Sequence, residues 1–147
     1  MTETEGMTIT RTFRAPRELV FDAWTNPVHF ARWWGGDTVE VPADSVEMDV
    51  RVGGSWKATM VLPEGGHEIH WVGEYLEVDP PERLVLTLSD GSEGDAREVV
   101  TVSLTEVAGG TEMVCHQDGG HLTPAQYEEA KKGYELFFDA FAEIVEA

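Results

Sequence analysis

The stretch TPAQYEEAKKGYELFFDAFAEIVE, residues 123–146, carries the clearest structural signal in the sequence. Thr123 is a favourable helix N-cap, Pro124 suits the first helical position, and Gln126 stands where a capping box places Glu or Gln. Apolar residues then recur at steps of three and four, which predicts a helix roughly 33 Å long. The apolar face comprises Tyr127, Ala130, Tyr134, Phe137, Phe138, Phe141, Ile144 and Val145. Such a face needs a large apolar partner from elsewhere in the chain.

Alternating apolar and polar residues precede this helix and predict strands with one buried face. The predicted strands cover 7–14, 37–52 with a bulge at Pro42, 55–62, 67–78, 83–89, 97–107 and 111–117. Their short connections, several marked by Gly-Gly pairs, are typical of an antiparallel meander.

Two short helices are predicted between the first two strands. In residues 15–27, Pro16 lies near the first turn, and Leu19, Val20, Ala23 and Trp24 follow at helical spacing. Residues 28–34 form the second helix, which ends at Gly35-Gly36. The order is therefore one strand, two short helices, six strands and one long helix, an α+β fold.

Chain length, net charge and cysteine content limit the class of protein. A chain of 147 residues suits one domain, here 7–147, with residues 1–6 as a flexible N-terminal tail. The formal net charge of −18 opposes binding to nucleic acid or anionic membranes. We interpret the acidity as a solvated surface, with adaptation to a salty host as the alternative. A single cysteine and a polar, acidic N-terminus favour a cytoplasmic location.

Five segments carry a resemblance to a known family. They are RTFRAPRELVFDAWTNP (11–27), ARWWGG (31–36), DVRVGGSWKATM (49–60), GEYLEVDPPERLVLT (73–87) and VTVSLTEVAGGTEM (100–113). In this order they resemble the START/birch-pollen-allergen-like (SRPBCC) superfamily, and within it the homologues of the activator of the heat-shock protein 90 ATPase. Gly133-Tyr134 departs from the Gly-Trp pair that family members often carry.

The resemblance implies a helix-grip fold, in which a curved antiparallel sheet of about seven strands wraps around the long C-terminal helix. It also implies a cavity between the two that binds hydrophobic molecules in superfamily members. Some members perform cyclase or aromatase steps there, and others act as protein partners, as the chaperone activators do.

Large apolar side chains on the inward faces are the candidate ligand wall, since ligand pockets are mostly apolar and aromatic. For any single one of them, a packed core is the better explanation. The set comprises Phe30, Trp34, Trp56, Met60, Trp71, Tyr75, Leu86, Met113, Tyr134, Phe137, Phe138 and Phe141. Of the adjacent tryptophans, we interpret Trp33 as core and Trp34 as the mouth of the cavity.

No catalytic, metal or cofactor site is expected. In HEIH (67–70), the offset of His67 and His70 sends them to opposite faces of a strand, and His116 is expected on the outer face. Cys115 alternates with inward residues and is interpreted as a small buried hydrophobe. Glu74 should face water, unless a bulge turns it inward as a candidate acid or base.

The sequence therefore favours binding of a small hydrophobic or aromatic molecule without covalent chemistry. A cyclase- or hydrolase-like enzyme using the same cavity is the first alternative, and a co-chaperone-like interaction module is the second. A homodimer is compatible with the sequence, while a chaperone partner rests on the family analogy alone.

Overall fold

The computed structural model describes residues 6–36, 39–63, 65–89, 98–119 and 122–146. The elements in chain order are β1 (Met7–Phe13), α1 (Arg17–Thr25), α2 (Pro27–Trp33), the 3-10 turn η2 (Ala43–Ser45), β2 (Glu47–Met48), β3 (Ser55–Val61), β4 (Glu68–Asp79), β5 (Arg83–Leu88), β6 (Glu98–Val107), β7 (Gly110–Asp118) and α3 (Pro124–Val145). The predicted tail lies outside the described residues, except for Gly6.

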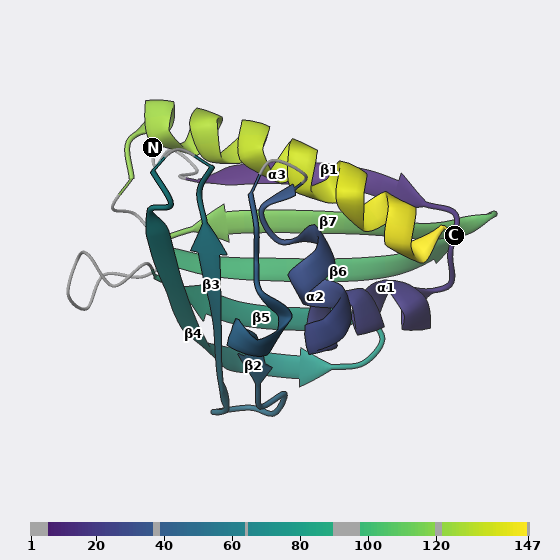
Figure 1. Cartoon of the computed structure of the whole chain (residues 1–147). Coiled ribbons are helices and arrows are strands. Elements are labelled where there is room, and N and C mark those ends of the chain that lie inside the picture. Colours follow the sequence, from purple (N-terminus) through teal and green to yellow (C-terminus); the bar gives the residue numbers. More distant parts are fainter. Residues whose placement is uncertain (1–5, 37–38, 64, 90–97, 120–121, 147) are drawn as a thin grey trace.

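The strands form one antiparallel sheet in the order β1-β7-β6-β5-β4-β3-β2. Consecutive strands from β2 to β7 are neighbours, and β1 closes the order beside β7, as expected for a meander. Figure 1 shows α3 lying along the sheet, with α1 and α2 on the same side near its C-terminal half. The predicted helix-grip fold is confirmed.

The predicted cap of α3 is confirmed in detail. The Thr123 hydroxyl accepts from the Gln126 backbone N–H at 3.1 Å, and the Gln126 side chain accepts from the Thr123 N–H at 2.8 Å. Two ion pairs, Arg11 to Asp139 at 2.6 Å and Arg14 to Glu146 at 3.7 Å, join β1 and the residue after it to α3. These contacts fix the helix over the first edge of the sheet.

The prediction of one long strand over 37–52 is wrong. Within its described part, Glu40 forms an isolated bridge with Val61, Ala43–Ser45 is a 3-10 turn, and only Glu47–Met48 pairs with β3. Pro42 has no N–H for a ladder, and its carbonyl instead accepts from Ser45 N at 3.0 Å, which closes the turn. The expected bulge is therefore a break.

A second correction concerns α1. Leu19, expected on the apolar face, is 51% exposed, whereas Phe21 is buried beside Val20 and Trp24.

The end of α2 agrees with the prediction, because Gly35 and Gly36 have φ of +94° and +74°, a conformation that favours glycine. A Cβ added at Gly36 would lie 3.6 Å from the carbonyl oxygen of Leu136 in α3.

Candidate ligand site between the sheet and the C-terminal helix

Aromatic rings from α2, β3, β4 and α3 meet around Trp34, the residue that follows α2. Trp34 stacks on Phe30 with ring centroids 5.0 Å apart. Its remaining ring neighbours are Trp33, Trp56, Trp71, Tyr134 and Phe137, at centroid distances of 5.7, 5.9, 5.9, 6.1 and 5.3 Å. Trp34 is therefore the point at which four elements of the fold meet.

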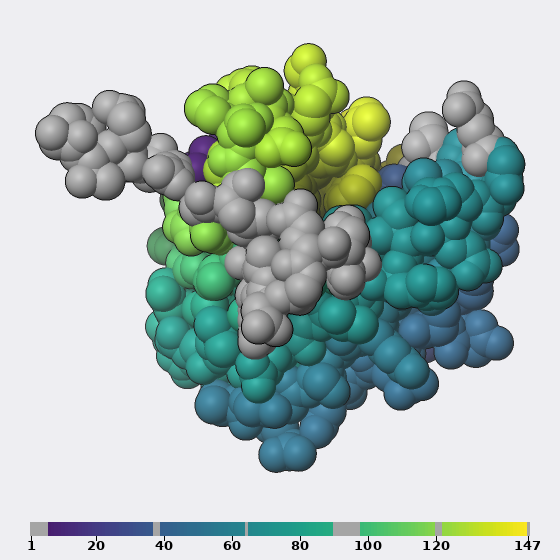
Figure 2. All heavy atoms as spheres, turned by 90° about the vertical axis from the view of Figure 1, so that its left-hand side faces the viewer, coloured from purple at the N-terminus to yellow at the C-terminus, as the bar shows by residue number. Residues whose placement is uncertain are grey.

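The predicted wall residues are brought together, most of them in full burial. Trp71 and Phe137 are half-buried, and both contact Trp34, so the aromatic cluster reaches the surface at these two side chains. The buried members are Phe30, Trp34, Trp56, Met60, Tyr75, Leu86, Met113, Tyr134, Phe138 and Phe141. Figure 2 shows the N-terminal part of α3 (yellow-green) at the top of this side of the molecule, with β3 and β4 (teal) below and to the right.

Three of the five indole N–H groups are hydrogen-bonded inside the protein. Trp33 Nε1 donates to the Ala23 carbonyl at 2.8 Å, and Trp56 Nε1 donates to the Thr87 carbonyl at 2.9 Å. Trp24 Nε1 donates to Met113 Sδ at 3.3 Å. These three side chains are anchored in the core by packing and by hydrogen bonds.

The remaining two indoles differ. The Nε1 atoms of Trp34 and Trp71 are buried and have no hydrogen-bond partner within the described chain. Leaving a buried donor without a hydrogen bond costs about 1–3 kcal/mol, and each such group in a native structure calls for an explanation. A ligand that presents acceptors to this wall would remove that cost.

Gly73 makes room for the Trp56 indole. It stands on the inner face of β4 directly opposite Trp56, between Trp71 and Tyr75 in sequence. A Cβ at this position would overlap the Thr87 carbonyl oxygen and Trp56 Nε1, the two atoms of that hydrogen bond. The inward position of a glycine in a strand therefore has a packing reason.

Tyr75 is a third buried donor without a partner in the described chain, at its phenol oxygen. Burial raises the pKa of this phenol above its usual value of 10.0, and the charge of Asp49 adds to the rise. The group stays protonated at neutral pH and can donate a hydrogen bond. It lies four residues along β4 from Trp71, on the same face.

Glu98 and Gln117 form a buried polar pair that the sequence analysis did not single out. Each is 4% exposed, and Gln117 Nε2 donates to Glu98 Oε1 at 3.1 Å. Burial raises the pKa of the Tyr134 phenol well above its usual value, with further contributions from Cys115 and Glu98.

A signal for this pair was present in the strand pattern. Glu98 has the same parity as the inward Val100 and Val102, and Gln117 has the same parity as Met113 and Cys115. Extending each alternation by one step would have placed two polar side chains in the core. Polar residues at inward positions are the informative exceptions.

Cys115 is fully buried on β7, as expected for a small hydrophobe. Desolvation raises the pKa of its thiol to about 12, so the thiolate that a nucleophile requires is not formed at neutral pH.

The histidines that the structure describes lie around the molecule rather than in one site. His70 Nε2 lies 3.4 Å from Glu68 Oε1, and His29 Nε2 lies 3.4 Å from Asp22 Oδ2. His116 bridges Thr8 and Asp118, each at 2.8 Å, and is half-buried. No group of three potential metal ligands occurs among the residues that the structure describes.

Glu74 lies outside the candidate site. Its backbone N–H donates to Thr87 Oγ1 at 3.0 Å, and the bulge in β4 falls after it, between Tyr75 and Glu77. A bulge there leaves the parity of Glu74 unchanged.

A surface depression of about 380 Å³ lies at the other end of the sheet, between the β1–α1 connection and the β6–β7 turn. Its lining includes Arg14, Arg17, Glu18 and Glu106, and none of the predicted wall residues. Within the described ranges, no helix has an apolar stretch long enough to cross a membrane.

The open antiparallel sheet, the long helix across it and the aromatic cluster between them define a helix-grip protein of the START/birch-pollen-allergen-like superfamily. The family model "Activator of Hsp90 ATPase homolog 1-like protein" matches residues 14–146, so the chain belongs to that family. No match is found among curated proteins.

Solved structures agree with this assignment. Protein CV1439 from Chromobacterium violaceum is 26% identical with a TM-score of 0.85, and the alignment covers 98% of this chain and 99% of that one. The AHSA1 protein from Silicibacter pomeroyi is 21% identical with a TM-score of 0.81, covering 95% and 96%. The AHSA1-like protein from Aeromonas hydrophila is 25% identical with a TM-score of 0.72, covering 91% of each chain.

Proposed function

We propose that the chain binds a small hydrophobic or aromatic molecule between the sheet and α3, at the aromatic cluster around Trp34. The observation that carries the proposal is the pair of buried, unpartnered indole N–H groups of Trp34 and Trp71. A core chosen only for stability would satisfy them or replace them, as it does for the other three tryptophans. Ligand sites combine an apolar wall with a few polar groups in this way.

The entrance lies at Trp71 and Phe137, the two half-buried members of the wall. Trp34 lies between them in the cluster and is followed by Gly35 and Gly36, both with positive φ. Rotation of Trp71 or Phe137 would expose the face of Trp34 without moving a strand. Burial of the ligand contributes affinity of about 25 cal/mol per Å² of apolar surface, less the ordering costs.

Native mass spectrometry of freshly purified protein tests the proposal first, and a retained small molecule is the expected result. Titration with 2-methoxynaphthalene, followed by tryptophan fluorescence, gives a defined probe. Trp71→Ala is expected to weaken the probe about tenfold, because it removes one wall of the site. Phe138→Ala is expected to weaken the probe and to lower the stability of the fold.

Val72→Ala is the matched control, since Val72 neighbours Trp71 but is 44% exposed on the opposite face of β4. It should leave the affinity unchanged. Absence of both a retained molecule and probe binding, or binding that neither Trp71→Ala nor Phe138→Ala alters, would remove the site from this cluster.

A cyclase- or hydrolase-like reaction in the same place is the second candidate, favoured by the buried pair Glu98 and Gln117. Catalysis needs a positioned acid or base beside the bound molecule, and Glu98 has the burial and the inward position for it. Conversion of a retained ligand by wild-type protein but not by Glu98→Gln would support this candidate.

A co-chaperone-like role is proposed from the family description alone, and a cytoplasmic location would suit it. Stimulation of a chaperone ATPase by the purified chain is its test. Analytical ultracentrifugation would show whether the chain forms the homodimer that its sequence allows.

A further inference from the structure

Trp34 and Trp71 form an edge-to-face pair in the aromatic cluster. Their ring centroids lie 5.9 Å apart, and their planes meet at 88°. Trp34 is 4% exposed, and Trp71 is half-buried where the cluster reaches the surface. Both Nε1 atoms are buried and have no hydrogen-bond partner within the described chain. The contact between the rings keeps the two N–H groups within the span of one small molecule.

An indole N–H donates a hydrogen bond and cannot accept one. The face of a neighbouring ring is a weak acceptor and does not replace the lone pair of an oxygen. Among the side chains whose rings contact Trp34, only Tyr134 carries an oxygen atom. The pair therefore offers donors to a bound molecule and needs an acceptor from it.

We propose that the bound molecule is a neutral aromatic carbonyl compound, whose oxygen accepts hydrogen bonds from the indole N–H groups of Trp34 and Trp71. The inference rests on the proposed function, because it names the chemistry of the ligand bound at this cluster. A carbonyl oxygen has two lone pairs and no proton, so it accepts from both indoles and brings no donor of its own. A hydroxyl group would bring a donor, and neither indole can accept from it.

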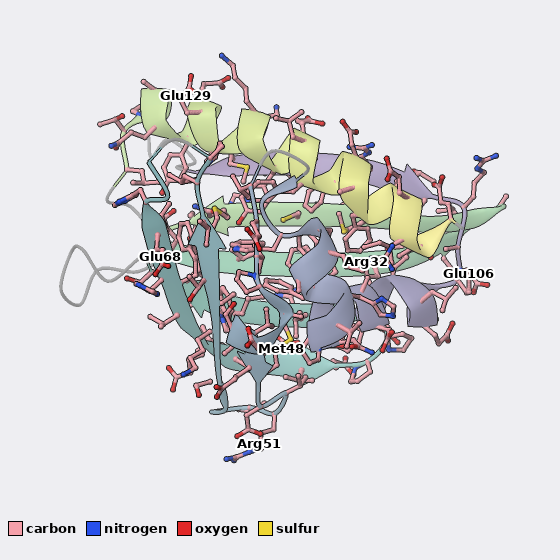
Figure 3. The ribbon with its side chains drawn as sticks, in the orientation of Figure 1. Arg32, Met48, Arg51, Glu68, Glu106 and Glu129 are labelled. Atoms are coloured by element: carbon pink, nitrogen blue, oxygen red, sulfur yellow. The ribbon has the colours of Figure 1, made fainter. Side chains whose placement is uncertain are left out.

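Charge favours a neutral acceptor over a carboxylate. The predicted wall contains no lysine, arginine or histidine, so a bound carboxylate would lie among apolar side chains without a counter-ion from the wall. Figure 3 labels Glu68 at the start of β4 and Glu129 in the first half of α3, on the same side of the molecule. Both are exposed, and Glu68 precedes Trp71 on the same strand. The formal net charge of −18 adds to the repulsion of an anion.

Four probes with the same naphthalene rings test the carbonyl group. 2-Acetylnaphthalene carries a ketone, and 2-isopropenylnaphthalene has nearly the same shape with a methylene group in place of the oxygen. The alcohol 1-(2-naphthyl)ethanol carries a hydroxyl group, and 2-naphthoate carries a negative charge. We expect wild-type protein at pH 7 to bind the ketone about tenfold tighter than each of the other three, by isothermal titration calorimetry.

Trp71→Phe keeps an aromatic ring and removes one N–H donor. The ratio of the affinities for ketone and alkene is expected to fall to about threefold or less, and Trp34→Phe should lower it in the same way. Trp24→Phe is the matched control, because the Trp24 indole already donates to Met113 Sδ at 3.3 Å, and it should keep the full ratio. Because the two probes have nearly the same shape, a general loss of packing in a variant affects both and leaves their ratio unchanged.

The carbonyl stretch of bound 2-acetylnaphthalene adds a readout that a merely structural role would not change. A hydrogen bond to the oxygen weakens the carbonyl double bond and lowers its stretching frequency. Isotope-edited infrared difference spectra should show this lowered frequency in wild type and in Trp24→Phe. In Trp71→Phe the band should move toward its position in hexane, where no donor is present.

The outcomes separate the carbonyl assignment from the proposed function. If wild type binds the alkene, the alcohol or the naphthoate as tightly as the ketone, the carbonyl assignment is overturned and ligand binding still stands. An unchanged ratio in both Trp71→Phe and Trp34→Phe overturns the assignment of these donors. Failure of all four probes to bind, with no retained molecule, overturns the proposed function itself. The wild-type comparison decides the carbonyl question even if a variant does not fold.

Discussion

Two regions of the aromatic interior use the same residue types in different ways. The packed end (Phe13, Trp24, Trp33 and Phe141) has both of its indole N–H groups hydrogen-bonded, and Trp33 is completely buried. The site end (Trp34, Trp71, Tyr134 and Phe137) has two indole N–H groups without partners in the described chain, and two side chains that reach the surface.

The adjacent residues Trp33 and Trp34 make the contrast clearest. They share a helix end and lie 5.7 Å apart between ring centroids, yet only Trp33 has its donor satisfied. Burial alone therefore does not distinguish a core residue from a candidate ligand contact. The hydrogen-bond state of the polar atom does.

The largest expected effect comes from Gly73→Ala. The added Cβ would overlap the Thr87 carbonyl and the Trp56 indole, so Trp56 must leave its place between the two regions. We expect the free energy of unfolding in urea to fall by about 3 kcal/mol. An unfolding midpoint equal to that of wild type would show that Trp56 does not depend on this gap.

The next prediction compares the loss of stability when each of the two adjacent tryptophans is substituted. Trp33→Phe is expected to lower the free energy of unfolding by about 2–3 kcal/mol, because it removes packing and leaves the Ala23 carbonyl unpaired. Trp34→Phe loses packing only and should cost about 1 kcal/mol less. Equal losses for both variants in urea denaturation would abolish the distinction between the two regions.

A third effect is the loss of stability at alkaline pH. In the folded chain the pKa of the Cys115 thiol is raised from 9.0 to about 12, so only the unfolded chain ionises it between these values. The contribution is fully present below pH 9.0 and is lost as the pH rises toward 12. We expect Cys115→Ala to show a smaller fall in urea midpoint between pH 8 and pH 10 than wild type, and an equal fall would contradict the assignment.

The smallest effect has the opposite sign. Gly133 lies inside α3, and a Cβ added there meets nothing within 4 Å. Gly133→Ala should therefore raise the free energy of unfolding by about 0.5–1 kcal/mol, because alanine loses less backbone entropy in a helix. Thermal unfolding measures it, and a destabilised variant would show that the site end tolerates no added atom on α3.

Local rules predicted most of the fold. The cap at Thr123, the three- and four-residue spacing of α3 and the alternation along β3 to β7 depend on near neighbours, and each agrees with the structure. The failure at 37–52 has a local cause as well, since Pro42 starts a turn where a bulged strand was expected.

The candidate site was harder to predict. Alternation identified the inward aromatic residues, but the partner of each indole comes from a distant part of the chain, as with Trp56 and Thr87. No spacing in the sequence could separate Trp33 from Trp34 on this ground. The alternation along β6 could have identified Glu98 as an inward residue, but its hydrogen-bond partner Gln117 comes from β7.

The position of α3 after all seven strands has a consequence for synthesis. Every strand leaves the ribosome before the helix that covers the inner face of the sheet, so the nascent chain carries an apolar surface without its cover. Assembly of the interior therefore waits for α3. Until then the growing polypeptide exposes apolar surface of the kind that chaperones bind.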